Sequence, residues 1–217
     1  MILELSLEEI KKLLVHQLSN LFLPPPENEK MLIEKVFGRT IERLNFNFSQ
    51  NPNKYYYRET EKGKESYFNP FHSGQWTIFL YYLSYELGHL QEDKHCAMIL
   101  ADKVYYLNKM MNSCDLYHQV ELPDYFRLDH PQGSVIGRAV YGNGFTFLQC
   151  CTVGNNKGLY PVIGDNVKMC MNSAILGNSH IGNNVIVGAG ALIKDQNIPD
   201  NCIVFGQSPN LIIKSKK

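Results

Sequence analysis

Apolar residues occupy every sixth position over a long stretch in the C-terminal half of the chain. The series runs without a gap through Ile163, Met169, Ile175, Ile181, Val187 and Ile193. Glycines and small or β-branched residues stand at fixed places between its members. A period of six differs from the 3.6 residues of an α-helix and from the two residues of an ordinary strand. It indicates hexapeptide repeats, in which short strands stack as the coils of a parallel β-helix.

This six-residue pattern begins near residue 113 and is interrupted once. Three leucines already stand six apart in its first part, namely Leu116, Leu122 and Leu128. Residues 154–161 then break the pattern, which resumes at Ile163 and continues to about Pro199. An insertion in a repeat protein is expected as an exposed loop on one face, and such loops often bind ligands. The turn-rich residues 204–209 are expected to cap the last coil.

The N-terminal half of the chain follows a helical pattern instead. Ser6 and Glu9 form a capping box in front of an apolar stripe. Residues 24–26 are prolines and end this helix, because proline lacks the backbone N–H. Three further helices are expected, over about 27–44, 72–90 and 92–112. Residues 45–70 are predicted to form a long loop or an irregular excursion. The aromatic residues of the last two helices favour core or subunit packing over a ligand site.

Together the two patterns predict an α+β chain with an α-helical N-terminal domain followed by a β-helix domain. The helical domain is expected over residues 1–112 and the β-helix over residues 113–213, with a basic tail at 214–217.

Composition excludes several kinds of protein. Lys plus Arg and Asp plus Glu both total 21, so bulk charge gives no reason to expect nucleic-acid binding. The six cysteines show no CxxC spacing, which favours free thiols in a reducing compartment over disulfides or a zinc site. The longest apolar run, residues 76–85, is about half of the ~20 residues that a membrane span needs. With no signal-peptide pattern at the N-terminus, we expect a cytoplasmic protein without a membrane span.

His130 and Asp115 are the candidate catalytic pair. His130 lies in the turn sequence Leu-Asp-His-Pro-Gln-Gly, and Asp115 precedes it by 15 residues. Since three strands of about six residues make one coil, this spacing is nearly a full turn, and Asp115 is expected to approach His130 from the neighbouring coil. A histidine held by a carboxylate has a fixed tautomer and suits a general base. A turn histidine and a turn aspartate with purely structural hydrogen bonds would give the same pattern, so both interpretations stay open on these residues alone.

Longer motifs extend the pattern around His130. They are Leu-Asp-His at 128–130, Gly-Ser-Val-Ile-Gly at 133–137, Leu-Gln-Cys-Cys-Thr-Val-Gly at 148–154, Ile-Leu-Gly-Asn at 175–178, Val-Gly-Ala-Gly-Ala at 187–191 and Gly-Gln-Ser-Pro at 206–209. This stretch resembles the catalytic coil of the serine acetyltransferase family, and the resemblance covers about residues 113–213. It implies a left-handed β-helix that assembles as a homotrimer and binds acetyl-CoA between subunits, without a metal. The helical domain is the part that would join two trimers into a dimer of trimers.

The same resemblance implies roles for individual residues. His130 is the implied general base, Asp115 the aspartate that orients it, and Asp129 an acceptor-binding residue. Backbone positions implied to line the pantetheine arm of acetyl-CoA are Gly154, Met171 and Ala189. The implied reaction is direct: His130 takes a proton from an acceptor hydroxyl, which attacks the acetyl thioester in a ternary complex. Cys150 and Cys151 would suit an acyl-enzyme, but strand cysteines are more commonly packed thiols.

The interrupting loop departs from the family pattern. Serine-specific members place an Arg-His pair before the proline of this loop, whereas this chain has Leu159 and Tyr160 before Pro161. A substrate carboxylate buried without a cationic partner is costly, while a tyrosine ring with one hydroxyl suits a sugar. Tyr160-Pro161 with the following residues 163–166 also resembles family members that acetylate surface polysaccharides or their precursors. We therefore expect a sugar or a capsular or O-antigen polysaccharide as acceptor, with Tyr160 contacting it. L-Serine is the alternative acceptor, and a non-catalytic β-helix scaffold is a third hypothesis.

Overall fold

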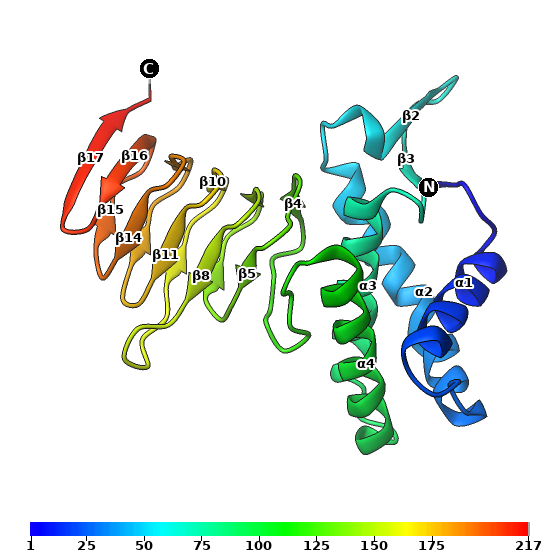
Figure 1. Ribbon diagram of the computed structural model, residues 1–217. Helices are drawn as coiled ribbons and strands as arrows, with labels where there is room; N and C mark the ends of the chain where they lie inside the picture. The colour runs from blue at the N-terminus through cyan, green and yellow to red at the C-terminus, as the bar shows by residue number, and fades with distance from the viewer. Residues whose placement is uncertain (217) are drawn as a thin grey trace. The chain divides into compact units, whose positions relative to one another are not determined.

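The computed structural model describes residues 1–216 of the chain, which forms two compact units (Figure 1). Met1–Asn112 make up the first unit and Ser113–Lys217 the second. Within residues 1–216, no helix is long and apolar enough to cross a membrane.

Four α-helices dominate the first unit. They are α1 (Leu7–Leu21), α2 (Glu27–Ser49), α3 (Ser73–Gly88) and α4 (Lys94–Asn112). The predicted capping box is confirmed: the Glu9 N–H donates to the Ser6 hydroxyl, and the Ser6 N–H donates to the Glu9 carboxylate. The predicted aromatic core is confirmed for Trp76 and Phe79 of α3, whose stacked rings are buried with centroids 4.7 Å apart.

The prediction of a loop over residues 45–70 was wrong. Helix α2 continues to Ser49, and a short 3₁₀ helix, η1 (Lys54–Tyr56), leads into a hairpin of β2 (Tyr57–Thr60) and β3 (Gly63–Phe68). The short strand β1 (Ile2–Leu3) pairs in parallel with β3. Phe68 is fully buried, with its ring against those of Phe48 and Trp76. This hairpin is held by aromatic contacts with two helices, which local periodicity in the sequence does not reveal.

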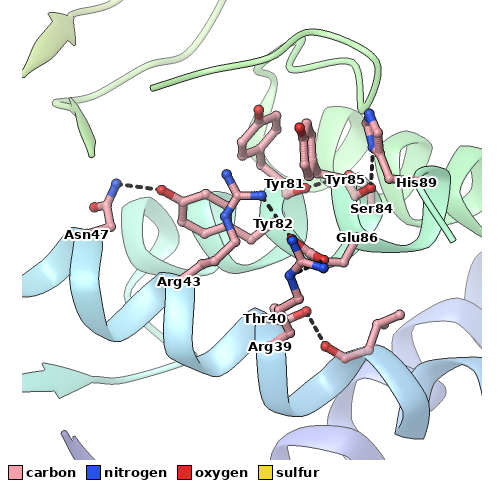
Figure 2. A network of polar contacts seen from close by, with 11 residues as sticks. Arg39, Thr40, Arg43, Asn47, Tyr81, Tyr82, Ser84, Tyr85, Glu86 and His89 are labelled. Atoms are coloured by element: carbon pink, nitrogen blue, oxygen red, sulfur yellow. Dashed lines mark hydrogen bonds and ion pairs between the residues drawn. The ribbon is translucent and has the colours of Figure 1, made fainter. Parts of the chain in front are cut away.

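A polar network joins α2 to α3, and Figure 2 shows it around the buried carboxylate of Glu86. Glu86 forms ion pairs with Arg39 Nε at 3.0 Å and Arg43 Nη1 at 2.9 Å. The Arg43 guanidinium also lies over the rings of Tyr82 and Tyr85, 4.8 and 4.6 Å from their centroids. Burial disfavours the charged form of Arg43, but the hydrogen bond to Glu86 and the electrostatic attraction of Glu86, Tyr82 and Tyr81 together outweigh it, so the pKa of Arg43 is raised. Two cations therefore compensate the one buried carboxylate.

The second unit is a parallel β-solenoid of about five turns with three faces. The first face contains β4 (Phe126–Leu128), β7 (Phe145–Phe147), β10 (Lys168–Met169), β13 (Ile186–Val187) and β16 (Cys202–Gln207). The second face contains β5 (Val135–Ile136), β8 (Thr152–Gly154), β11 (Ala174–Leu176) and β14 (Leu192–Lys194). The third face contains β6 (Val140–Tyr141), β9 (Val162–Ile163), β12 (His180–Ile181) and β15 (Asn197–Ile198). Strand β17 (Asn210–Ser215) pairs antiparallel with β16 after the last coil. Residues 214 and 215 of the segment expected as a tail are therefore part of a strand, and Lys217 lies outside the described residues.

The six-residue pattern reflects the way each strand contributes one inward side chain. Met169 pairs with Phe147 on one side and with Val187 on the other, and all three side chains are fully buried. Ile175 and Ile193 form the same kind of pair on the second face. Stacked side chains of this sort fill the interior of the solenoid. The predicted fold class, a helical region followed by a parallel β-helix, is confirmed.

Candidate functional site

His130 lies in the corner that joins the first face of the solenoid to the second. Six residues, 129–134, connect β4 to β5, whereas four residues, 148–151, connect β7 to β8 in the next coil. The backbone aligns the two corners, because the Cys150 N–H donates to the Gln132 carbonyl at 2.9 Å. The first corner therefore contains two additional residues, and His130 lies in this longer segment.

The side chain of His130 points into solvent. Its backbone has a φ of 48°, in the left-handed region, and its side chain is 82% exposed. The Nε2 atom lies 3.6 Å from Oδ1 of Asp129, which is itself 62% exposed. A histidine in this position can exchange a proton with a bound hydroxyl, and the neighbouring carboxylate would stabilise its cation.

Asp115 sits one coil below the strand that follows this corner. Its N–H donates to the Ser134 carbonyl at 2.9 Å, its carbonyl accepts from the Ile136 N–H at 3.0 Å, and it forms an isolated parallel bridge with Val135. The ion-pair partner that the structure gives His130 is Asp129. A hydrogen bond between Asp115 and His130 therefore stays a prediction.

Two of the three residues expected near acetyl-CoA follow the same edge of the solenoid as His130. Met171 and Ala189 lie in the corners of the next coils, where the Gly190 N–H donates to the Met171 carbonyl at 3.0 Å. Both are exposed. Gly154 instead ends β8, at the opposite edge of the second face, and its carbonyl accepts from the Gly177 N–H at 3.0 Å. Within one chain, the residues expected near acetyl-CoA therefore lie at two opposite edges of the second face.

The interruption after β8 is an exposed hairpin, as its sequence predicts. Asn156 and Leu159 exchange backbone hydrogen bonds, and the two residues between them, Lys157 and Gly158, both have positive φ. This is the geometry of a tight two-residue turn. Tyr160 follows the hairpin and is exposed. Strand β8 leads from the His130 edge to this hairpin, so Tyr160 and His130 lie at opposite edges of the second face.

The two adjacent cysteines differ in exposure. Cys151 is buried, with Sγ 3.2 Å from the Cys170 carbonyl, and burial raises the pKa of its thiol. Cys150 is exposed, so the interpretation of both as packed thiols is wrong for this residue. Cys150 occupies the left-handed corner position, with a φ of 55°, rather than a strand position facing the interior.

A metal centre has no obvious place among residues 1–216, where no three His, Cys, Asp or Glu side chains are grouped closely enough to hold an ion.

Part of the solenoid is similar to known hexapeptide-repeat proteins. Residues 160–195 match the family model described as bacterial transferase hexapeptide (six repeats). The chain is also similar to serine acetyltransferases. It is 28% identical to the one from Synechococcus elongatus over 115 residues, covering 51% of this chain and 47% of the relative. It is 30% identical to the one from Staphylococcus epidermidis over 128 residues, covering 57% of this chain and 59% of the relative. The chain thus spans about half the length of the curated relatives it matches.

Solved structures of serine acetyltransferases share the fold. The serine acetyltransferase of Neisseria gonorrhoeae superposes with a TM-score of 0.69 at 21% identity, covering 99% of this chain and 81% of that one. A serine acetyltransferase in complex with CoA superposes with a TM-score of 0.61 at 17% identity, covering 85% of this chain and 75% of that one. All four of these proteins are called serine acetyltransferases. They give no support to the polysaccharide-acting members that the loop sequence suggests.

Proposed function

We propose that this protein transfers an acetyl group from acetyl-CoA to the hydroxyl of an acceptor, with His130 as general base. The observation that carries the proposal is the exposed His130, with its positive φ, in a corner of the solenoid that is two residues longer than the next one. The similarity to serine acetyltransferases supports the same reaction. A non-catalytic scaffold would not explain why His130 lies in the stretch that resembles the catalytic coil of the serine acetyltransferase family.

Proton movement at His130 is the chain's main contribution to the reaction. Acetyl-CoA supplies the acetyl group as an activated thioester. Neutral His130 accepts the proton of the acceptor hydroxyl, and the oxygen of that hydroxyl forms a bond to the thioester carbonyl carbon. The carbon–sulfur bond then breaks, and the proton passes from His130 to the departing thiolate. Asp129, 3.6 Å from Nε2, stabilises the transient imidazolium, and Asp115 is the second carboxylate that we assign to this role.

A homotrimer would complete the site. His130, Met171 and Ala189 follow one edge of the second face, whereas Gly154 and Tyr160 lie at the other. Packing three copies around an axis brings the first edge of one copy beside the second edge of the next. Acetyl-CoA would then lie between subunits, as the resemblance implies. Pairing of two trimers through the helical unit and a cytoplasmic location remain parts of the proposal.

L-Serine is the acceptor that the comparisons favour. A serine acetyltransferase of Neisseria gonorrhoeae with the same fold has been solved in complex with serine. A sugar hydroxyl is the second candidate, because Leu159 and Tyr160 are exposed before Pro161 and Lys157 is the only basic residue between 154 and 161. Tyr160 would stack on a sugar ring, and Asp129 would accept a hydrogen bond from its hydroxyls.

An acceptor screen distinguishes the two candidates. Thiol release from acetyl-CoA is measured with L-serine, with a panel of sugars and oligosaccharides, and without acceptor. Release that rises with L-serine supports the first candidate, and release that rises only with saccharides supports the second. In the second case, the Leu159→Arg/Tyr160→His variant should gain activity toward L-serine, because it supplies cations for the carboxylate. Release that no acceptor raises would overturn the proposed function.

A further inference from the structure

Ser134 connects the corner of His130 to the corner of the next coil. It is the last residue of the segment 129–134, and its side chain is almost completely buried, with 1% of the residue exposed. Its hydroxyl donates to the Leu148 carbonyl at 2.7 Å and accepts from the Cys151 N–H at 3.0 Å. Leu148 and Cys151 are the first and last residues of the corner 148–151. One hydroxyl therefore holds both ends of the following corner against the end of the His130 corner.

The backbone of Ser134 forms hydrogen bonds within its own corner and with the coil below. Its N–H donates to the Pro131 carbonyl at 3.1 Å, which closes the segment just after His130. Its carbonyl accepts from the Asp115 N–H at 2.9 Å. Ser134 therefore bonds to the coil below, to its own corner and to the coil above. Displacement of this residue would move both His130 and Asp115.

The next corner has only a thiol in place of this hydroxyl, with Cys151 Sγ 3.2 Å from the Cys170 carbonyl, and the two corners after it do without the link. The positions equivalent to Ser134 in the next coils are Cys151, Ser173 and Ala191, as the pairing of the following strands shows. Ala191 has no hydroxyl, and the Ser173 hydroxyl donates to Cys170, within its own corner, at 2.7 Å. A buried hydroxyl that crosses to the next corner is thus not needed to build a four-residue corner. It accompanies the corner 129–134, which is two residues longer than the corners that follow it along this edge.

From this geometry we infer that Ser134 is a positioning residue, which holds the lengthened corner so that the His130 imidazole stays in one place. The inference rests on the proposed function of His130. A longer corner has more conformations available, and the two hydrogen bonds of a buried hydroxyl remove some of them. Small displacements of a proton-transfer group slow the chemical step strongly, by up to roughly 100-fold for a shift of about 1 Å.

The test compares Ser134→Ala with Ser173→Ala, a serine that is equally buried at the equivalent position two coils away. Ser134→Ala should lower kcat by roughly 10- to 100-fold while the KM for acetyl-CoA changes little. The pH profile of kcat should shift, because the environment of His130 changes. Ser173→Ala should keep the wild-type profile. Ser134→Cys should fall between wild type and Ser134→Ala, since a thiol fits this position in the next coil but donates a weaker hydrogen bond.

Histidine NMR separates this inference from the proposed function. The ¹H–¹³C ring signal of His130, assigned with His130→Ala, should shift or broaden in Ser134→Ala and stay unchanged in Ser173→Ala. This result supports the positioning role even if no acceptor is ever found. An unchanged His130 signal in Ser134→Ala would overturn the inference, as would equal losses of kcat in the two alanine variants. Thermal unfolding of both variants shows whether the lost activity reflects lost folding.

Discussion

Adjacent coils approach closely along a column of glycines on the third face of the solenoid. Gly142, Gly164 and Gly182 each follow a strand of this face, and there is no room for a Cβ at any of them. A Cβ on Gly142 would lie 2.5 Å from the Gly164 carbonyl oxygen and 2.6 Å from the Asp165 nitrogen. Ordinary van der Waals contact begins at 3.4 Å. Because these are backbone atoms of the next coil, no side-chain rotation relieves the overlap, and Gly142→Ala must push the coils apart.

Two contributions lower the free energy of unfolding of Gly142→Ala. Overpacking of a well-packed interior costs about 1–3 kcal/mol and sometimes more. Separation of the coils also stretches the hydrogen bond from the Gly142 N–H to the Ile163 carbonyl, now 2.8 Å, which contributes about 1 kcal/mol. We therefore expect Gly142→Ala to lower the free energy of unfolding by about 3 kcal/mol or more, a large part of the stability of a typical domain.

Two other glycines serve as controls in the same denaturant titration, followed by circular dichroism. Gly190 has a φ of 70° and open space around its Cβ position, so Gly190→Ala should cost only backbone strain, about 1–2 kcal/mol. Gly38 lies in α2, also with open space, and Gly38→Ala should stabilise the helix by about 0.5–1 kcal/mol. Unfolding of Gly142→Ala and Gly190→Ala at the same denaturant concentration would refute the overlap with the next coil as the cause.

The thiols and the capping box provide two further predictions. At neutral pH an alkylating reagent should modify the exposed Cys150 but not Cys114 or Cys151 until the protein unfolds. Burial raises the pKa of Cys114 to about 12 and also raises the pKa of Cys151. Equal labelling of all three cysteines by peptide mass spectrometry would contradict this. Hydrogen bonds from Ser6 lower the pKa of Glu9, so this carboxylate stabilises the folded state above its unfolded pKa of 4.5, and that stabilisation is lost as pH falls through the folded pKa. Fluorescence of the single tryptophan should therefore report a smaller loss of stability between pH 6 and pH 3 in Ser6→Ala than in wild type, and an identical loss would refute the coupling.

The solenoid could be predicted from the sequence because its rule is local. Every coil repeats the same inward positions, so a period of six marks residues such as Ile175 and Ile193 directly. The hairpin over residues 57–68 could not be predicted in this way. Its strand β3 is stabilised by the rings of Phe48 and Trp76, which belong to helices before and after it in the chain. Contacts of this kind leave no periodic signal within the strand.

The candidate site, too, could be predicted from the sequence only in part. The turn around His130 is visible in the sequence, but its geometry is not. A spacing of 15 residues suggests that Asp115 lies almost one coil from His130, whereas the structure pairs Asp115 with Val135, after the end of the longer corner. The two additional residues of that corner offset the register. Sequence spacing also does not reveal that Tyr160 and His130 lie at opposite edges of one face, because that depends on where each strand turns.

The most direct test of the account is acetyl transfer by His130→Ala, with His180→Ala as the matched control. His180 is a second exposed histidine of the solenoid, on β12 of the third face. With an acceptor that wild type uses, His130→Ala should release thiol from acetyl-CoA no faster than the acceptor-free background, while His180→Ala should keep the wild-type rate. Both variants should retain the wild-type circular dichroism spectrum. A wild-type rate in folded His130→Ala would contradict the assignment of this residue as the general base.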